Sequence, residues 1–112
     1  MKDKLVEIKN ELDHLSGEVF SAEHEKNQLI QVEEEFHSLF RKNDRLLQEL
    51  KYEWKTGEMN FLIHDAETEL KRHQRNAVQE IEDEIYSLNK KMKLLEEKEQ
   101  DLHQKIRIIS LS

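Results

Sequence analysis

The sequence predicts an all-α fold, a long antiparallel two-helix hairpin with coiled-coil-like packing and a turn near residues 55–58. Its 112 residues include no Pro and only two Gly, whereas sheets and barrels of this length need many turns. Ala, Glu, Lys, Leu and Arg supply 55 residues, about half, a share typical of long helices. Apolar residues recur in steps of three and four, and this register breaks once. We therefore expect one domain over residues 1–112, with helices at about 2–54 and 58–109.

The first predicted helix carries one apolar seam, meaning a line of side chains that faces the partner helix. Its register runs to Trp54 without a phase change and is interrupted only by Lys26, Glu33 and Asn43. The apolar members are Leu5, Ile8, Leu12, Leu15, Val19, Ala22, Leu29, Phe36, Phe40, Leu47, Leu50 and Trp54. Gly17 lies inside this helix, where Gly is about 1 kcal/mol less favourable than Ala.

The turn is predicted where this register fails. Continued past Trp54, the seam would fall on Gly57, Phe61, His64, Thr68 and Lys71, most of which are unsuited to it. Gly commonly follows a helix C-terminus because it accepts the left-handed backbone conformation. Trp54 and Gly57 are therefore the candidate turn residues, and Thr56 is an alternative N-cap for the second helix.

The second predicted helix has a seam in a new phase. Its expected members are Ile63, Ala66, Leu70, His73, Ala77, Ile81, Ile85, Leu88, Met92, Leu95, Leu102, Ile106 and Ile109, with Glu99 as an exception. Two consecutive steps of four, from Ala77 to Ile81 to Ile85, indicate a stutter in the coiled-coil repeat.

An antiparallel hairpin brings together positions whose numbers sum to about 113. It places Phe36 opposite Ala77, so that a large side chain meets a small one, as a filled seam requires. A parallel dimer of one unbroken helix is the alternative, and it would stack Lys26 on Lys26. The hairpin is favoured because it avoids that pairing.

The first helix has more apolar surface near the turn than one partner helix can cover. Val32, Leu39 and Leu46 are seven residues apart and flank the seam, which widens it to the breadth found in helix bundles. The predicted partner-binding residues are Val32, Leu39, Leu46, Trp54, Phe61 and Leu62. Two alternatives stay open, a broader seam within the chain and self-association.

No catalytic, cofactor-binding or metal-binding residue is predicted, and the chain is not expected to be an enzyme. Glu34 and His37 form one E-x-x-H spacing, whereas di-iron bundles need two such motifs and two further Glu. The two Gly are isolated, so no phosphate-binding loop is present. His73 is expected at a seam position opposite Phe40, as a partly buried histidine.

The distribution of charged residues indicates which classes of partner the chain could bind. Arg41, Lys42 and Arg45 are expected near Arg72 and Arg75, in a basic belt suited to an acidic partner helix. Nucleic acid is not an expected partner, because the net charge is −7 and acids outnumber bases in both halves. No membrane partner is expected either, because no apolar stretch approaches about 20 residues and the polar faces are rich in Glu.

The sequence at the turn carries a family resemblance. Residues 52–61 read YEWKTGEMNF, and a Trp and a Gly in the bend of a Cys-free hairpin resemble the WxG-type (ESAT-like) proteins of type VII secretion, although the spacing here is W-x-x-G. The stretch 29–102, with its QVEEEF and LLQELKYEW segments, more closely resembles the LXG-associated α-helical (Lap) proteins. These are small helical partners of LXG-domain toxins in Gram-positive bacteria.

The resemblance implies a non-catalytic, chaperone-like role. The hairpin would bind the N-terminal helical LXG domain of a toxin, beside a second small helical hairpin, and support export. Trp54 would anchor the bend, and Phe61 and Asp65 have the spacing of an F-x-x-x-D export motif. A cytoplasmic location is expected, with co-secretion left open. The alternative is a homo-oligomeric coiled-coil scaffold or adaptor, and a homodimer in the absence of a partner is also left open.

Overall fold

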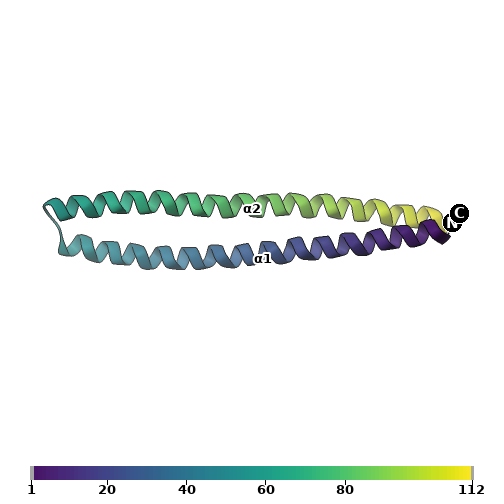
Figure 1. The fold of residues 1–112 in the computed structure, drawn as a ribbon, viewed down its shortest axis with the longest axis horizontal. Helices are drawn as coiled ribbons and strands as arrows, with labels where there is room; N and C mark the ends of the chain where they lie inside the picture. The colour runs from purple at the N-terminus through teal and green to yellow at the C-terminus, as the bar shows by residue number, and fades with distance from the viewer. Residues whose placement is uncertain (1, 112) are drawn as a thin grey trace. The chain divides into compact units, whose positions relative to one another are not determined.

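The chain is an all-α helical hairpin, as the sequence predicts. The computed structural model describes residues 2–111, in which helix α1 (Lys2–Glu53) is followed by helix α2 (Glu58–Leu111), and those residues contain no strand. Figure 1 shows the two helices joined by one short turn. Helix α1 ends one residue earlier than predicted and α2 extends two residues further. Within the described residues, neither helix has a stretch apolar enough to cross a membrane.

The hairpin divides into two compact units, each built from a segment of both helices. The terminal unit contains residues 2–28 of α1 and residues 85–111 of α2. The turn unit contains residues 29–84, and therefore the turn itself. Each unit pairs an α1 segment with an antiparallel α2 segment.

The terminal unit has the better buried core. Its buried side chains are Ile8, Ala22, Leu88, Leu95 and Leu102. The other predicted seam residues in this unit are partly buried, and they include the polar exceptions Lys26 and Glu99. The predicted seam is therefore confirmed along this unit.

The turn unit buries much less. Ile63 and Ile81 are its buried apolar residues, while Phe36 and Phe40 stay partly exposed with their ring centroids 5.8 Å apart. Two helices alone thus leave the aromatic part of this seam open to water on one side.

The prediction is wrong for two seam residues of α2. Ala66 and His73 are exposed, and the next residues, Glu67 and Gln74, occupy the partly buried seam. The His73 side chain is 67% exposed, so it is not a partly buried histidine opposite Phe40. Both registers consist of steps of three and four, so the spacing allows either one, and the hydrophobicity of Ala66 favours the wrong one.

The turn comprises residues 54–57, between the two helices. Gly57 has a φ of 88°, a left-handed conformation that side chains with a Cβ rarely adopt. Its carbonyl accepts a 3.3 Å hydrogen bond from the Phe61 amide, so Gly57, not Thr56, is the N-cap of α2. The Asn60 side chain donates a 2.8 Å hydrogen bond to the Trp54 carbonyl and ties the end of α1 to the start of α2.

Candidate functional site

The turn unit presents an apolar stripe along α1. We use this name for Val32, Leu39 and Leu46, whose exposed fractions are 37%, 50% and 56%. Seven residues make nearly two helical turns, so the three side chains lie on one side of α1. The structure thus places these three predicted residues together in a position to meet another helix.

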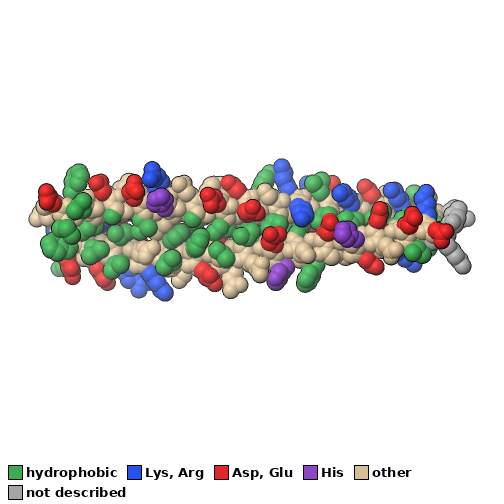
Figure 2. Space-filling model, in the orientation of Figure 1, with side chains coloured by type: hydrophobic (Ala, Val, Ile, Leu, Met, Phe, Trp, Pro, Cys, Tyr) green, Lys and Arg blue, Asp and Glu red, His purple; other side chains and the backbone are tan. Residues whose placement is uncertain are grey.

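A second apolar group surrounds the turn. The predicted residues Trp54, Phe61 and Leu62 are exposed there, together with Tyr52 and Met59. We call these five residues the turn cluster, and Figure 2 shows hydrophobic side chains gathered near the turn. Met59 could not be predicted from the sequence, because a single residue outside the seam register carries no periodic signal.

Trp54 lies in the turn and is 46% exposed. Its backbone amide donates a 2.9 Å hydrogen bond to the Leu50 carbonyl, and its carbonyl accepts the hydrogen bond from Asn60. Phe61 and Asp65, the pair with export-motif spacing, are both exposed and lie one turn apart on the same side of α2.

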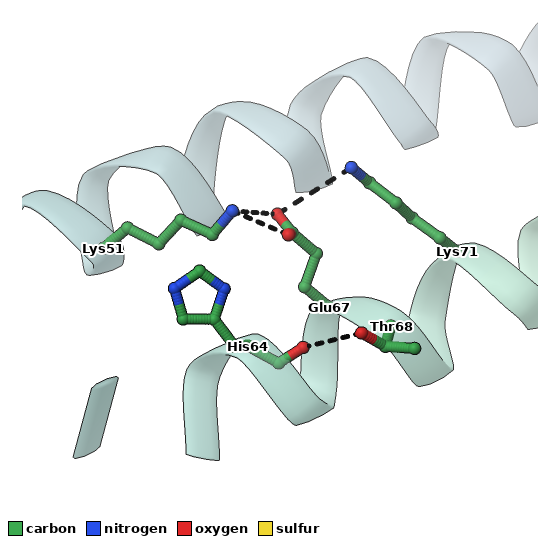
Figure 3. A network of polar contacts seen from close by, with 5 residues as sticks. All are labelled: Lys51, His64, Glu67, Thr68 and Lys71. Atoms are coloured by element: carbon green, nitrogen blue, oxygen red, sulfur yellow. Dashed lines mark hydrogen bonds and ion pairs between the residues drawn. The ribbon is translucent and has the colours of Figure 1, made fainter. Parts of the chain in front are cut away.

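A charge pair that the sequence analysis did not predict joins the helices beside the turn. Figure 3 shows the Glu67 carboxylate of α2 between Lys51 of α1 and Lys71 of α2. The Lys51 Nζ lies 2.6 Å from both carboxylate oxygens, and the Lys71 Nζ lies 3.9 Å from Oε2. The Lys51 and Glu67 side chains are only 22% and 13% exposed. The seam spacing allows either Ala66 or Glu67 after Ile63, so the sequence pattern alone does not indicate this pair.

The environment of Glu67 stabilises its charged form. The hydrogen bond from Lys51 lowers the pKa of this carboxyl below its ordinary value of 4.5, against the opposing effect of burial. The Oε2 atom is buried and takes no hydrogen bond, so its contacts are ionic. A carboxylate held ionised in this way positions α1 against α2 and is poorly suited to proton transfer.

A basic groove runs between the helices on the other flank of the seam. The groove has a volume of about 810 Å³, and its lining includes Phe40 and Val78 together with Arg41, Lys71 and Arg75. Arg41 is two residues from Leu39, a rotation of about 200° around α1, so the groove and the apolar stripe face different directions.

The predicted basic belt is therefore confirmed in part. Arg41 and Arg75 line the same groove, whereas Lys42, Arg45 and Arg72 do not. Arg45 borders a separate hollow near the turn, and Arg72 pairs with Glu69 on its own helix at 3.3 Å.

The E-x-x-H pair does not assemble into a ligand set. The His37 Nε2 lies 4.0 Å from Glu33 Oε1, so the acidic neighbour of His37 is Glu33 and not Glu34 of the motif. Between residues 2 and 111 no group of three His, Asp or Glu side chains is arranged to hold a metal ion.

Comparison with known proteins gives one finding. A family model described as a protein of unknown function, DUF3958, matches residues 3–109. Neither the curated proteins nor the solved structures contain a match to the chain.

Proposed function

The chain belongs to the DUF3958 family, whose description assigns no activity, and we propose that it is a non-catalytic, chaperone-like binding protein. Its partner is the N-terminal helical LXG domain of a type VII secretion toxin, and binding supports the export of that toxin. No step of this function uses a cofactor or a covalent change.

The exposed apolar stripe on the turn unit is the observation that supports this proposal. Full burial of an exposed Val or Leu side chain contributes about 1.5–3 kcal/mol. The stripe residues are 37–56% exposed, so each offers roughly half of that energy to an apolar helix. Phe36 and Phe40 in the neighbouring seam are also incompletely buried, which indicates that two helices alone do not complete the packing of the turn unit. A surface of this kind is typical of a helix-in-groove interface.

The identity of the partner rests on the resemblance of residues 29–102 to Lap proteins. Long toxin helices expose apolar faces before they reach the secretion machinery, and such faces aggregate in water. The hairpin covers such a face with its stripe, and the turn cluster extends the contact beyond the end of α1. A second small hairpin would cover the opposite side of the toxin helices.

Co-purification with an LXG domain encoded beside this chain tests the proposal. We expect a stable complex, and we expect Leu39→Asp combined with Leu46→Asp to weaken it by at least about a hundredfold, because two buried contacts become buried charges. Leu94→Asp is the matched control, since Leu94 is an exposed leucine of the terminal unit. A complex that survives the double substitution would show that the stripe is not the contact.

A further inference from the structure

We propose that the basic groove is a self-association surface, on which two copies of the chain pack groove to groove in antiparallel orientation. In this dimer Arg41 and Arg75 of one copy meet Glu34 and Glu82 of the other. The inference goes beyond the proposed function, because it concerns a different flank of the turn unit and needs no toxin.

Two cations of the groove, Arg41 and Arg75, have no counter-ion within the chain. Among residues 2–111, their side chains take part in no ion pair or hydrogen bond, and both residues are exposed. Residues 36–48 and 70–79 contain six Lys or Arg and one acid, Asp44, in a chain whose net charge is −7. This local excess of positive charge favours contact with a carboxylate-bearing surface.

A carboxylate-bearing surface lies on the same flank of this chain. Glu34 precedes Arg41 by seven residues and Glu82 follows Arg75 by seven, so each carboxylate shares a helix side with its arginine. Asp83 adds to this acidic group, because its Oδ1 accepts a 2.9 Å hydrogen bond from Gln79, which lines the groove.

The arginines and glutamates are also spaced as a symmetric dimer requires. Helices α1 and α2 are antiparallel, so the step from Arg41 back to Glu34 and the step from Arg75 on to Glu82 both lead away from the turn. Each step covers about 10 Å along its helix. Consider a two-fold axis perpendicular to the helices, placed halfway between each arginine and its glutamate. This axis brings every arginine opposite a glutamate of the second copy, as an isologous interface requires.

Apolar atoms occupy the middle of this arrangement. Phe40 and Val78 line the groove between the basic and acidic groups, near the proposed axis. They supply the desolvated centre that an interface of charged pairs needs. Both halves of the charge complementarity lie on this one surface, which favours a second copy over an unrelated acidic helix.

Sedimentation equilibrium of the chain alone tests the proposal. We expect a monomer–dimer equilibrium whose dissociation constant rises about tenfold between about 0.05 M and 0.5 M NaCl, because salt screens exposed charge pairs. A chain that stays monomeric up to about 1 mM in low salt would overturn the proposal.

Charge reversal identifies the surface. R41E/R75E and E34K/E82K should each weaken the dimer by at least about thirtyfold, because like charges then face each other. An equimolar mixture of the two variants should associate within about threefold of the wild-type constant, because opposite charges meet again. If the mixture stays monomeric, or if either variant dimerises as the wild type does, the proposed pairing is wrong.

Two further variants complete the design. K42E/R72E makes the same change in net charge in the same helical turns but outside the groove, so it should leave the dimer unchanged. L39D/L46D should also dimerise normally, so failure of toxin binding and failure of this proposal give different results. Circular dichroism checks that each variant is helical, and R41Q/R75Q repeats the test if charge reversal reduces helicity.

Discussion

Gly57→Ala should destabilise the hairpin although there is room for the added methyl group. A Cβ built on Gly57 meets no atom within 4 Å, so the substitution creates no clash. The expected loss comes from the backbone, because the φ of 88° lies in the left-handed region. Holding an L-residue there costs about 1–2 kcal/mol.

Gly17→Ala is the matched control and should have the opposite sign. A Cβ at Gly17 also meets no atom within 4 Å, but this residue lies in the interior of α1. There Ala is favoured over Gly by about 0.5–1 kcal/mol. The two Gly→Ala variants should therefore differ in unfolding free energy by about 1.5–3 kcal/mol.

Urea unfolding followed by circular dichroism measures this difference. With a slope of about 1–2 kcal/mol per molar urea, the two midpoints should lie roughly 1–2 M apart, on either side of the wild type. Gly57→Asn should fall between wild type and Gly57→Ala, because Asn tolerates the left-handed region better than Ala. If Gly57→Ala proves as stable as wild type, the positive φ does not hold the turn and the reasoning is refuted.

The charge pair beside the turn leads to two further predictions. Lys51→Met should lower the unfolding free energy by about 1–2 kcal/mol, because the mostly buried Glu67 carboxylate loses its hydrogen-bond donor and keeps only the more distant Lys71 at 3.9 Å. Arg72→Met should change it by less than about 0.5 kcal/mol, since the Arg72 and Glu69 side chains are 60% and 65% exposed, and equal effects in urea unfolding would contradict this ranking. The Glu67 pKa is lowered on folding, so the stability contributed by its charge is present above the ordinary value of 4.5 and is lost as the pH falls through the lower folded value. Wild type should therefore lose more stability than Glu67→Gln between neutral pH and about pH 3, and parallel losses in acid unfolding would show that Glu67 is not responsible.

The α1 seam could be predicted from the sequence in full up to Leu50. Regular spacing identified even the polar members Lys26, Glu33 and Asn43, all of which are partly buried. The prediction worked because the spacing and the hydrophobicity of the residues agree along this helix.

The first part of the α2 seam could not be predicted as well, because steps of three and four allow either Ala66 or Glu67 after Ile63. Hydrophobicity favours Ala66, but the seam contains Glu67, which becomes acceptable there once Lys51 neutralises it. That partner is 16 residues away and on the other helix, so only the three-dimensional structure reveals it. The basic residues of the groove were predicted in part, but its apolar lining was not, since Phe40 and Val78 come from different helices.

The division into two units has a consequence for the order of folding. The turn unit is one continuous segment, whereas the terminal unit joins two segments separated by residues 29–84. Closing that long loop first would cost more chain entropy than closing the short turn. Assembly is therefore expected to begin beside Gly57 and to proceed toward the chain ends. The terminal unit, which has the better buried core, is expected to form last. Its packing should therefore mainly slow unfolding and have little effect on the folding rate.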